Sequence, residues 1–230
     1  MKGIFVTGTD TGVGKTIVTG LLAKFLKDKG YKVITQKWVE TGSCRFSKDV
    51  NFHLKLINKK KRELRDHLSD ISPYTFKFRS SPHLASSLTK RKISIERIKK
   101  SFKSLEKAFN FVVVEGVGGA LVPLTRDKLV IDVAGELNLP VLVVVGNKLG
   151  TINHTLLTLE ALKARKMKII GVVFNNLGNK ESKLILKDNP KIIETISGQK
   201  SLGSLPWTKD IDRLHKNFRK IGKKILSNLK

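Results

Sequence analysis

The sequence predicts an α/β fold in which a doubly wound, mainly parallel sheet is flanked by helices. Short apolar runs rich in β-branched residues recur along the chain, and segments with helical spacing of apolar residues alternate with them. Near-continuous apolar character is typical of strands buried on both faces, as in a parallel sheet. The 230 residues fit one such domain, from residue 1 to residue 230.

The expected strands and helices follow one another in chain order. Strand-like runs occupy residues 4–6, 33–34, 111–114, 141–145 and 169–174. Helical spacing covers residues 16–29, which end before the capping Gly30, and residues 151–165. Strands that alternate with helices at this pitch indicate a doubly wound α/β fold.

The longest connection runs from the strand near residue 37 to the strand near residue 111, and long crossovers often carry function. We expect helices over 49–57 and 94–108 within it, with a loop around 72–83. At the C-terminal end, apolar residues again recur at helical spacing, opposite a basic face. A single apolar stripe is what docking on a sheet requires, so a docked helix is favoured over one lying on a membrane surface.

The composition favours a reducing, cytoplasmic compartment. Cys44 is the one cysteine, so no disulfide can form within the chain. We expect neither a signal peptide nor a membrane span, because the apolar runs are short. The 45 basic and 19 acidic residues give a net charge of +26, which attracts anions. Because the lysines are scattered, we interpret this charge as compositional bias and expect no specific nucleic-acid site.

A glycine-rich segment between the first strand and the first helix predicts a phosphate-binding loop. Residues 8–16 read Gly-Thr-Asp-Thr-Gly-Val-Gly-Lys-Thr. Backbone amides in the tight turn, with the positive end of the following helix, bind phosphate oxygens. Lys15 is placed to reach the β- and γ-phosphates, and the Thr16 hydroxyl to bind Mg²⁺. The motif predicts a P-loop NTPase-like fold that holds Mg-ATP through Asp10, Thr11, Gly12, Val13, Gly14, Lys15 and Thr16.

Two positions depart from common P-loop patterns. The usual spacing puts the first glycine at position 9, where this chain has Thr9. P-loop ATPases of DNA partition carry a second lysine five residues before the P-loop lysine, where this chain has Asp10. A carboxylate beside phosphates is repelled, so Asp10 either faces a substrate ammonium or Mg²⁺-bound water, or simply stabilises the turn.

Further polar residues follow buried strands, at the edge where α/β proteins bind ligands. Glu115 ends one strand and either holds Mg²⁺ together with Thr16 or bonds nearby backbone amides. Lys37 ends another strand, where a second cation could stabilise a transferring phosphoryl group. Thr41 either hydrogen-bonds a substrate or caps a turn. Asn175 either reads the adenine edge or ends its strand in a turn.

Taken together, these segments resemble dethiobiotin synthetase, the ATP-dependent enzyme of biotin synthesis. The resemblance runs in order over almost the whole chain, and the ordered set is more specific than the P-loop alone. It rests on the P-loop at 8–16, Lys37 with Thr41-Gly42, Pro-Tyr-Thr-Phe at 73–76, Ser-Pro-His at 81–83, Glu-Gly-Val-Gly-Gly at 115–119, Pro-Leu at 123–124, Gly-Thr-Ile-Asn-His at 150–154, Asn175, and Leu-Pro-Trp at 205–207. Departures are Trp38 in place of proline, Glu40 in place of a small residue, and a shortened loop before Asp49.

The resemblance implies a cyclo-ligase whose substrates are 7,8-diaminononanoate, CO₂ and ATP. One amine captures CO₂ as a carbamate, the carbamate takes the γ-phosphoryl group to give a carbamic–phosphoric anhydride, and the second amine closes the ureido ring. A carbamate is already anionic, so the enzyme's work is alignment and charge neutralisation rather than general-base catalysis.

The resemblance also assigns roles to individual residues. Lys15, Lys37 and Thr41 are the expected catalytic residues, and Lys37 and Thr41 also bind substrate. Gly150 and Asn153 are expected to bind the substrate's carboxylate tail across the interface of a homodimer. The expected Mg²⁺ ligands are Thr16, Asp49 and Glu115, and the expected nucleotide-binding residues beyond the P-loop are Glu115, Gly118 and Asn175.

Two other functions fit parts of the sequence. A P-loop ligase of the cobyrinic-acid amidase type would carry a glutamine-hydrolysing domain with its own cysteine nucleophile, and this chain has neither the length nor a suitable cysteine. A DNA-partition ATPase would explain the charge of +26. Asp10 and the loop after Glu115 count against the partition ATPase.

Overall fold

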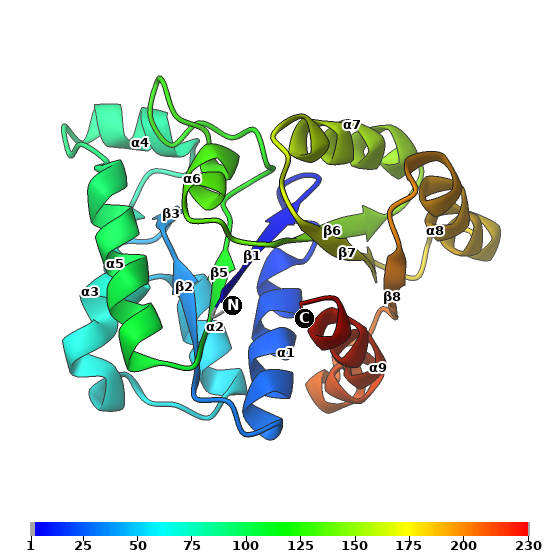
Figure 1. The fold of residues 1–230 in the computed structure, drawn as a ribbon, viewed down its shortest axis with the longest axis horizontal. Helices are drawn as coiled ribbons and strands as arrows, with labels where there is room; N and C mark the ends of the chain where they lie inside the picture. The colour runs from blue at the N-terminus through cyan, green and yellow to red at the C-terminus, as the bar shows by residue number, and fades with distance from the viewer. Residues whose placement is uncertain (1–2, 230) are drawn as a thin grey trace.

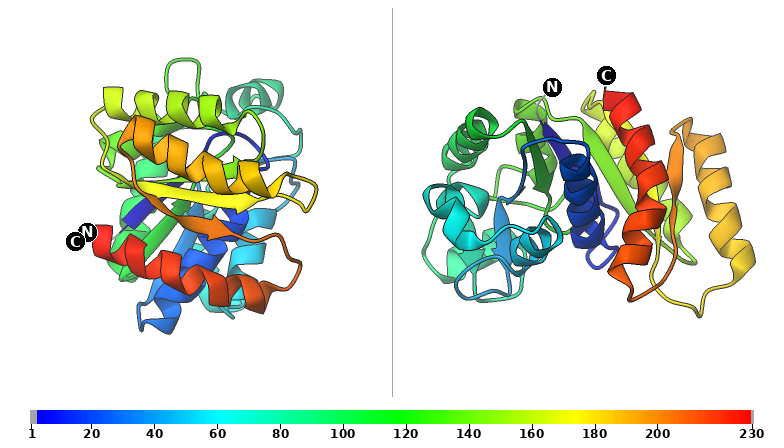
Figure 2. Two further views of the ribbon diagram at one scale, coloured as in Figure 1. Left: turned by 90° about the vertical axis from the view of Figure 1, so that its right-hand side faces the viewer. Right: turned by 90° about the horizontal axis from the view of Figure 1, so that it is seen from below.

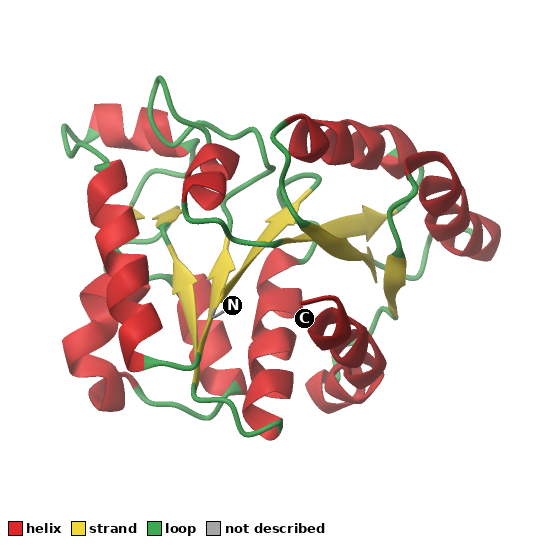
Figure 3. Cartoon of the chain, in the orientation of Figure 1, coloured by secondary structure: helices red, strands yellow, loops and turns green. Residues whose placement is uncertain are grey.

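A six-stranded parallel sheet forms the centre of the molecule (Figures 1 and 3). The computed structural model describes residues 3–229. The strand order β2-β5-β1-β6-β7-β8 puts β1 between β5 and β6, and all neighbours in the sheet run parallel. The strands are β1 (Gly3–Gly8), β2 (Val33–Lys37), β5 (Phe111–Glu115), β6 (Val141–Asn147), β7 (Ile169–Asn176) and β8 (Ser201–Leu205).

Helices cover both faces of the sheet, so the expected doubly wound α/β fold is confirmed. Figure 2 shows α1 (Lys15–Asp28) beside α9 (Ile211–Leu229) on one face, where α2 (Lys48–Leu56) also packs on α1. The other face carries α5 (Ile95–Ala108), α7 (Thr151–Ala164) and α8 (Lys183–Ser197). The shorter helices are the 3₁₀ helix η1 (Lys61–His67), α3 (Leu68–Ile71), α4 (Pro82–Leu88) and α6 (Val130–Glu136).

The long crossover differs from expectation at one place. The expected helices 49–57 and 94–108 correspond to α2 and α5. The segment expected to be a loop, 72–83, contains strand β4 (Tyr74–Phe76) and the start of α4. Strand β4 pairs in parallel with β3 (Val39–Thr41) in a separate two-stranded sheet. Three-residue strands give too short a pattern to be recognised from one sequence, because their pairing depends on distant residues.

The C-terminal helix α9 docks through its apolar stripe on strands β7 and β8 of the sheet, as its spacing predicts, and also packs on α1. Its buried residues are Leu214, Phe218, Ile221, Gly222 and Ile225. A side chain at Gly222 would clash, since an added Cβ would lie 2.7 Å from the Phe25 ring of α1. Among residues 3–229, no helix is long and apolar enough to cross a membrane.

The sheet also brings the functional segments to one end. Strands β1, β2 and β5 are neighbours in register, so that Val6 pairs with Glu115 and Glu115 pairs with Lys37. Trp38 follows β2 into the core, where its ring stacks on Phe5 with centroids 5.2 Å apart. The loop after β1 and the last residues of β2 and β5 therefore meet at the carboxyl end of the sheet.

Candidate active site

A cavity of about 750 Å³ opens at the carboxyl ends of β1, β2 and β5. The phosphate loop forms one wall, and the start of α2 and the segment before α4 form another. The lining residues are Thr11, Gly12, Gly14, Lys15, Thr16, Lys37, Glu40, Thr41, Gly42, Ser43, Lys48, Asp49, Arg79, Ser80, Ser81, Pro82, Glu115, Val117, Gly118 and Val122.

The phosphate loop turns through two glycines into helix α1. Gly12 and Gly14 have φ of 78° and 99°, in the left-handed region that glycine adopts most readily. The Lys15 ammonium folds back and donates to the Asp10 carbonyl oxygen at 2.8 Å. Burial, and repulsion by the nearby Lys37, lower the pKa of Lys15 to about 8. An anionic phosphate beside this ammonium would favour its charged form.

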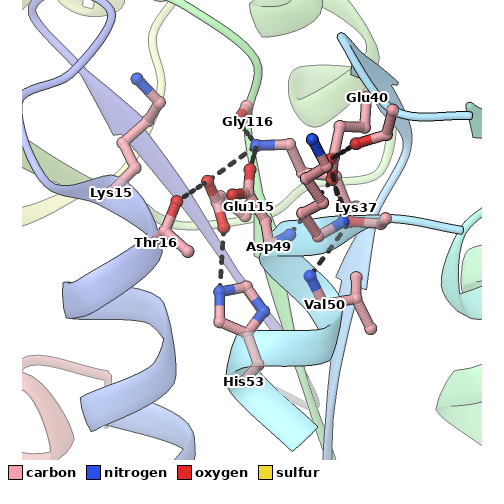
Figure 4. Close-up of polar contacts among 12 residues, drawn as sticks. Lys15, Thr16, Lys37, Glu40, Asp49, Val50, His53, Glu115 and Gly116 are labelled. Carbon is pink, nitrogen blue, oxygen red and sulfur yellow. Dashed lines mark hydrogen bonds and ion pairs between the residues drawn. The ribbon is translucent and has the colours of Figure 1, made fainter. Parts of the chain in front are cut away.

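Glu115 is the centre of the polar network in the cavity (Figure 4). Its Oε1 accepts hydrogen bonds from the Thr16 hydroxyl at 2.9 Å and from the Lys37 ammonium at 2.7 Å. Its Oε2 lies 3.0 Å from Nε2 of His53. Burial alone would raise the pKa of Glu115, but Lys37 and His53 outweigh it and hold the pKa well below its usual range. Glu115 is therefore a buried carboxylate anion.

Lys37 lies between two carboxylates. Its ammonium donates to Asp49 Oδ2 at 2.7 Å, to Glu115 Oε1 at 2.7 Å and to the Gly116 carbonyl oxygen at 3.1 Å. Burial favours the neutral amine, but the two carboxylates outweigh it and raise the pKa of Lys37. Burial and the negative charge of Glu115 raise the pKa of Asp49. The Lys37 ammonium thus reduces the repulsion between two acidic groups that lie close together.

Glu40 is a buried carboxylate beneath the first turn of α2. It accepts hydrogen bonds from the hydroxyls of Ser43 and Ser47 and from the backbone N–H of Lys48 at 2.8 Å and of Asp49 at 3.3 Å. A carboxylate at a helix N-terminus compensates the free N–H groups and the positive end of the helix dipole. Glu40 therefore anchors the start of α2 and the backbone of Asp49.

The side-chain chemistry fits a magnesium ion that also draws on phosphate oxygens. Thr16, Asp49 and Glu115 supply hydroxyl and carboxylate oxygens, which Mg²⁺ prefers. Oε2 of Glu115 faces His53 at 3.0 Å, whereas Oε1 accepts from the Thr16 hydroxyl, so Oε1 is the oxygen on the side of the phosphate loop. Within residues 3–229, no three His, Cys, Asp or Glu side chains are grouped to hold a metal by themselves. The protein oxygens alone therefore make an incomplete site, which a nucleotide's phosphates would complete.

Most of the residues singled out from the sequence gather around this cavity. Asn175 lies just outside the lining, where its side-chain amide donates to the Val13 carbonyl oxygen at 3.0 Å. The amide sits so close that a side chain at Gly14 would clash with it. Asp10 is exposed, and its Oδ1 accepts from the Thr11 N–H at 2.6 Å, an arrangement that stabilises the turn.

Two of those residues lie elsewhere on the chain. Gly150 is the left-handed N-cap of α7, and Asn153 lies in the first turn of this helix. Both are exposed, and neither lines the cavity. Within one chain they do not join the site formed by Lys15, Lys37 and Glu115.

His53 and Glu40 contribute to the site without having been expected to. His53 lies four residues after Asp49 on α2. That spacing puts both side chains on one face of the helix, so the sequence does hold a signal for His53. Glu40 carries no such signal, because its partners lie in a loop whose conformation the sequence does not reveal.

The comparisons with known proteins identify the family of the chain. A family model described as an AAA domain matches residues 2–215. The ATP-dependent dethiobiotin synthetase of Thermodesulfovibrio yellowstonii is 36% identical over 98% of this chain and 95% of its own length. The corresponding Haemophilus influenzae protein is 40% identical over 84% of this chain and 99% of its own.

Solved structures support the fold. A pNOB8 ParA bound to nonspecific DNA has a TM-score of 0.61 at 14% identity, covering 99% of this chain and 98% of its own. The MinD cell division protein of Aquifex aeolicus has a TM-score of 0.60 at 14% identity, covering 99% and 97%. At that identity the likeness concerns the P-loop NTPase-like architecture alone. From its similarity to the curated relatives over nearly its full length, the chain belongs to the dethiobiotin synthetase family of ATP-dependent ligases.

Proposed function

We propose that this chain forms dethiobiotin from 7,8-diaminononanoate, CO₂ and Mg-ATP through a carbamate and a carbamic–phosphoric anhydride. The observation that carries the proposal is the convergence of Lys15, Thr16, Lys37 and Glu115 on one cavity beside the phosphate loop. The buried ammonium groups of Lys15 and Lys37 line the cavity, and the lining residues listed above include neither histidine nor cysteine. That set suits a reaction whose substrate already carries the attacking anion.

The chemical steps balance without a general base of unusual strength. One amine adds to CO₂ and loses a proton to give a carbamate. A carbamate oxygen forms a bond to the γ-phosphorus, and the bond from that phosphorus to ADP breaks. The second amine attacks the carbonyl carbon and loses a proton, and phosphate leaves as the ureido ring closes.

Lys15, Lys37 and Thr41 have distinct roles in these steps. Lys15 binds the β- and γ-phosphates, and Lys37 offsets the negative charge that builds where carbamate and phosphate meet. The Thr41 hydroxyl now donates to the Ser80 carbonyl oxygen at 2.7 Å, which holds it at the cavity wall. From this wall Thr41 binds the substrate amine or its carbamate.

Nucleotide binding extends from the P-loop to the neighbouring strands. Gly118 lines the cavity with φ of 61°, so the chain after Glu115 can pass close to the phosphates. Asn175, fixed against the P-loop backbone, presents its amide to the adenine edge. Thr16, Asp49 and Glu115 hold Mg²⁺, which supplies charge neutralisation for the phosphates when bound.

A second copy of the chain completes the substrate site. Large apolar side chains are exposed on α7, on α8 and in the loop before α7: Leu157 is 56%, Leu184 79% and Leu149 76% exposed. Gly150 and Asn153 lie in this same region, outside the cavity of their own chain. A homodimer through this face would cover the leucines and bring Gly150 and Asn153 to the partner's substrate.

We expect Leu157→Glu to abolish the dimer, because a charge would be buried in an apolar interface. Sedimentation velocity at micromolar concentration measures the effect. The matched control is Leu88→Glu, which changes a leucine on α4 that is 58% exposed. The control should sediment like the unaltered chain. A dimeric Leu157→Glu variant, or a monomeric unaltered chain, would contradict this interface.

Phosphate release separates the proposed ligase from a partition-type ATPase. We expect release from Mg-ATP to require the diamine and bicarbonate, and to stay at background when duplex DNA replaces the diamine. Identification of dethiobiotin by mass spectrometry completes the test. Release stimulated by DNA alone would overturn the assignment in favour of the partition ATPase.

DNA binding itself should be weak despite the charge of +26. Scattered lysines give nonspecific attraction, with dissociation constants of roughly 10⁻⁴ to 10⁻⁶ M at physiological salt and a steep fall as salt rises. Fluorescence anisotropy on random duplex DNA over a salt series tests this expectation. Sub-micromolar, sequence-selective binding would show a dedicated DNA site.

A further inference from the structure

His53 is a fully buried imidazole whose polar contact is with the site carboxylate Glu115. Its Nε2 lies 3.0 Å from Glu115 Oε2, and the exposure of both side chains is 1% or less (Figure 4). Within residues 3–229, no hydrogen bond of standard geometry reaches either ring nitrogen of His53 or Oε2 of Glu115. The close contact between Nε2 and Oε2 therefore offsets part of the free-energy cost of burying both polar groups.

Helix α2 delivers Asp49 and His53 to the same pair of residues. The two side chains are four residues apart and lie on one face of α2. Asp49 contacts Lys37, and His53 contacts Glu115, which itself contacts Lys37. Helix α2 thus secures both members of the central ion pair, one from each successive turn.

Helix α1 leaves room for the imidazole at Gly20. A Cβ there would lie 3.3 Å from Cδ2 of His53 and 2.6 Å from the Leu56 side chain. The absence of a side chain lets α2 approach α1 closely enough for the ring to reach β5. An apolar residue in place of His53 could fill this space without burying an unpaired nitrogen, so packing alone does not account for histidine.

We propose that His53 is a positioning residue that orients the Glu115 carboxylate toward the bound metal and phosphates. A proton carried on Nε2 would face Oε2 across the 3.0 Å contact and restrain the rotation of the carboxylate. Oε1 is then held toward Thr16 and the cavity, as its 2.9 Å hydrogen bond from the Thr16 hydroxyl shows. This inference rests on the proposed role of Glu115 as a metal ligand, and such outer partners commonly tune metal affinity.

Three substitutions in the full chain separate orientation from packing. In His53→Gln the side-chain N–H₂ reaches about as far as Nε2, in His53→Asn it falls short, and His53→Leu removes the donor but keeps an apolar side chain. Mn²⁺ replaces Mg²⁺ as the probe, and its affinity is measured by electron paramagnetic resonance with a non-hydrolysable ATP analogue bound. Thermal unfolding shows whether each variant is folded.

We expect His53→Asn and His53→Leu to weaken Mn²⁺ binding about tenfold, with analogue affinity unchanged in the absence of metal. His53→Gln should recover most of the affinity, because its N–H₂ restores the contact. The matched control is His67→Leu, which removes a ring that packs on Phe109 at 5.3 Å. His67 does not line the cavity, so this control should bind Mn²⁺ normally.

Glu115→Gln shows whether a failed result argues against the positioning role of His53 or against the role of Glu115 as a metal ligand. If Glu115→Gln weakens Mn²⁺ binding but folded His53→Asn and His53→Leu variants do not, the positioning role is overturned and the metal ligand stands. If Glu115→Gln binds Mn²⁺ normally, the metal assignment falls, and the role of His53 falls with it. A His53→Gln variant as defective as the folded His53→Asn variant would also overturn the positioning role. If His53→Leu does not fold, the comparison of Gln with Asn decides.

Discussion

Replacing Lys15 with alanine is expected to cut turnover by at least about a hundredfold, in line with the loss of one preorganised charge stabiliser. Lys15 is the buried first residue of α1, and its ammonium donates to the carbonyl oxygen of Asp10. A phosphate that enters the loop offers it a far better, anionic partner. The loss should grow in the transition state, where charge spreads over the transferring phosphoryl oxygens.

The fold should tolerate this change, because Lys15 makes its hydrogen bond within its own loop. Steady-state kinetics with the diamine, bicarbonate and Mg-ATP measure the loss, and circular dichroism verifies folding. The matched control is Lys29→Ala, which removes an equal charge from the exposed opposite end of α1. It should turn over near the unaltered rate. A folded Lys15→Ala enzyme with normal turnover would refute the role of Lys15 in phosphate neutralisation.

The sequence was informative wherever a signal was local. The P-loop is a contiguous motif, and apolar runs mark strands such as β5 and β6 because these are buried on both faces. Glu115 directly follows such a run, and Lys37 comes three residues after the run 33–34. In a parallel sheet the ends of such runs share one edge, so the fold class predicts that both residues lie at this edge. It does not predict their bond length of 2.7 Å, since that depends on β2 and β5 being direct neighbours.

Features that depend on contacts between distant residues could not be predicted from the sequence. Strand β8 reads Ser-Leu-Gly-Ser-Leu, which lacks the apolar run of a buried strand and is defined by its pairing with β7. In the sequence, Glu40 is only a departure from the family pattern. Its role depends on four hydrogen-bond donors that the fold brings together at the start of α2. The predicted substrate-binding role of Gly150 and Asn153 stays a prediction for another reason, because a single chain does not show what a partner chain would contact.

Replacing Glu115 with glutamine is expected to slow turnover by about a hundredfold and to raise the Mg²⁺ requirement about tenfold. Glutamine keeps the size and most hydrogen bonds of Glu115 but removes its charge. ATP binding should weaken less than phosphoryl transfer, because the P-loop amides still hold the phosphates. Lys37 keeps its ion pair with Asp49 at 2.7 Å, so the buried ammonium is not left alone and the variant should fold.

Asp49→Asn tests whether Asp49 is a ligand of Mg²⁺ or only a partner of Lys37. Asp49 is 30% exposed where Glu115 is 1%, and its charge is balanced by Lys37. As a metal ligand, Asp49 should show a shifted Mg²⁺ titration similar to that of Glu115→Gln. As a partner of Lys37 alone, it should show slower turnover with an unchanged Mg²⁺ titration, because only the position of the ammonium is disturbed. Turnover measured against Mg²⁺ at saturating ATP separates these results. If Asp49→Asn matches the unaltered enzyme in both measurements while Glu115→Gln does not, Asp49 has no part in the metal site, and nucleotide oxygens and waters supply the remaining ligands beside Thr16 and Glu115.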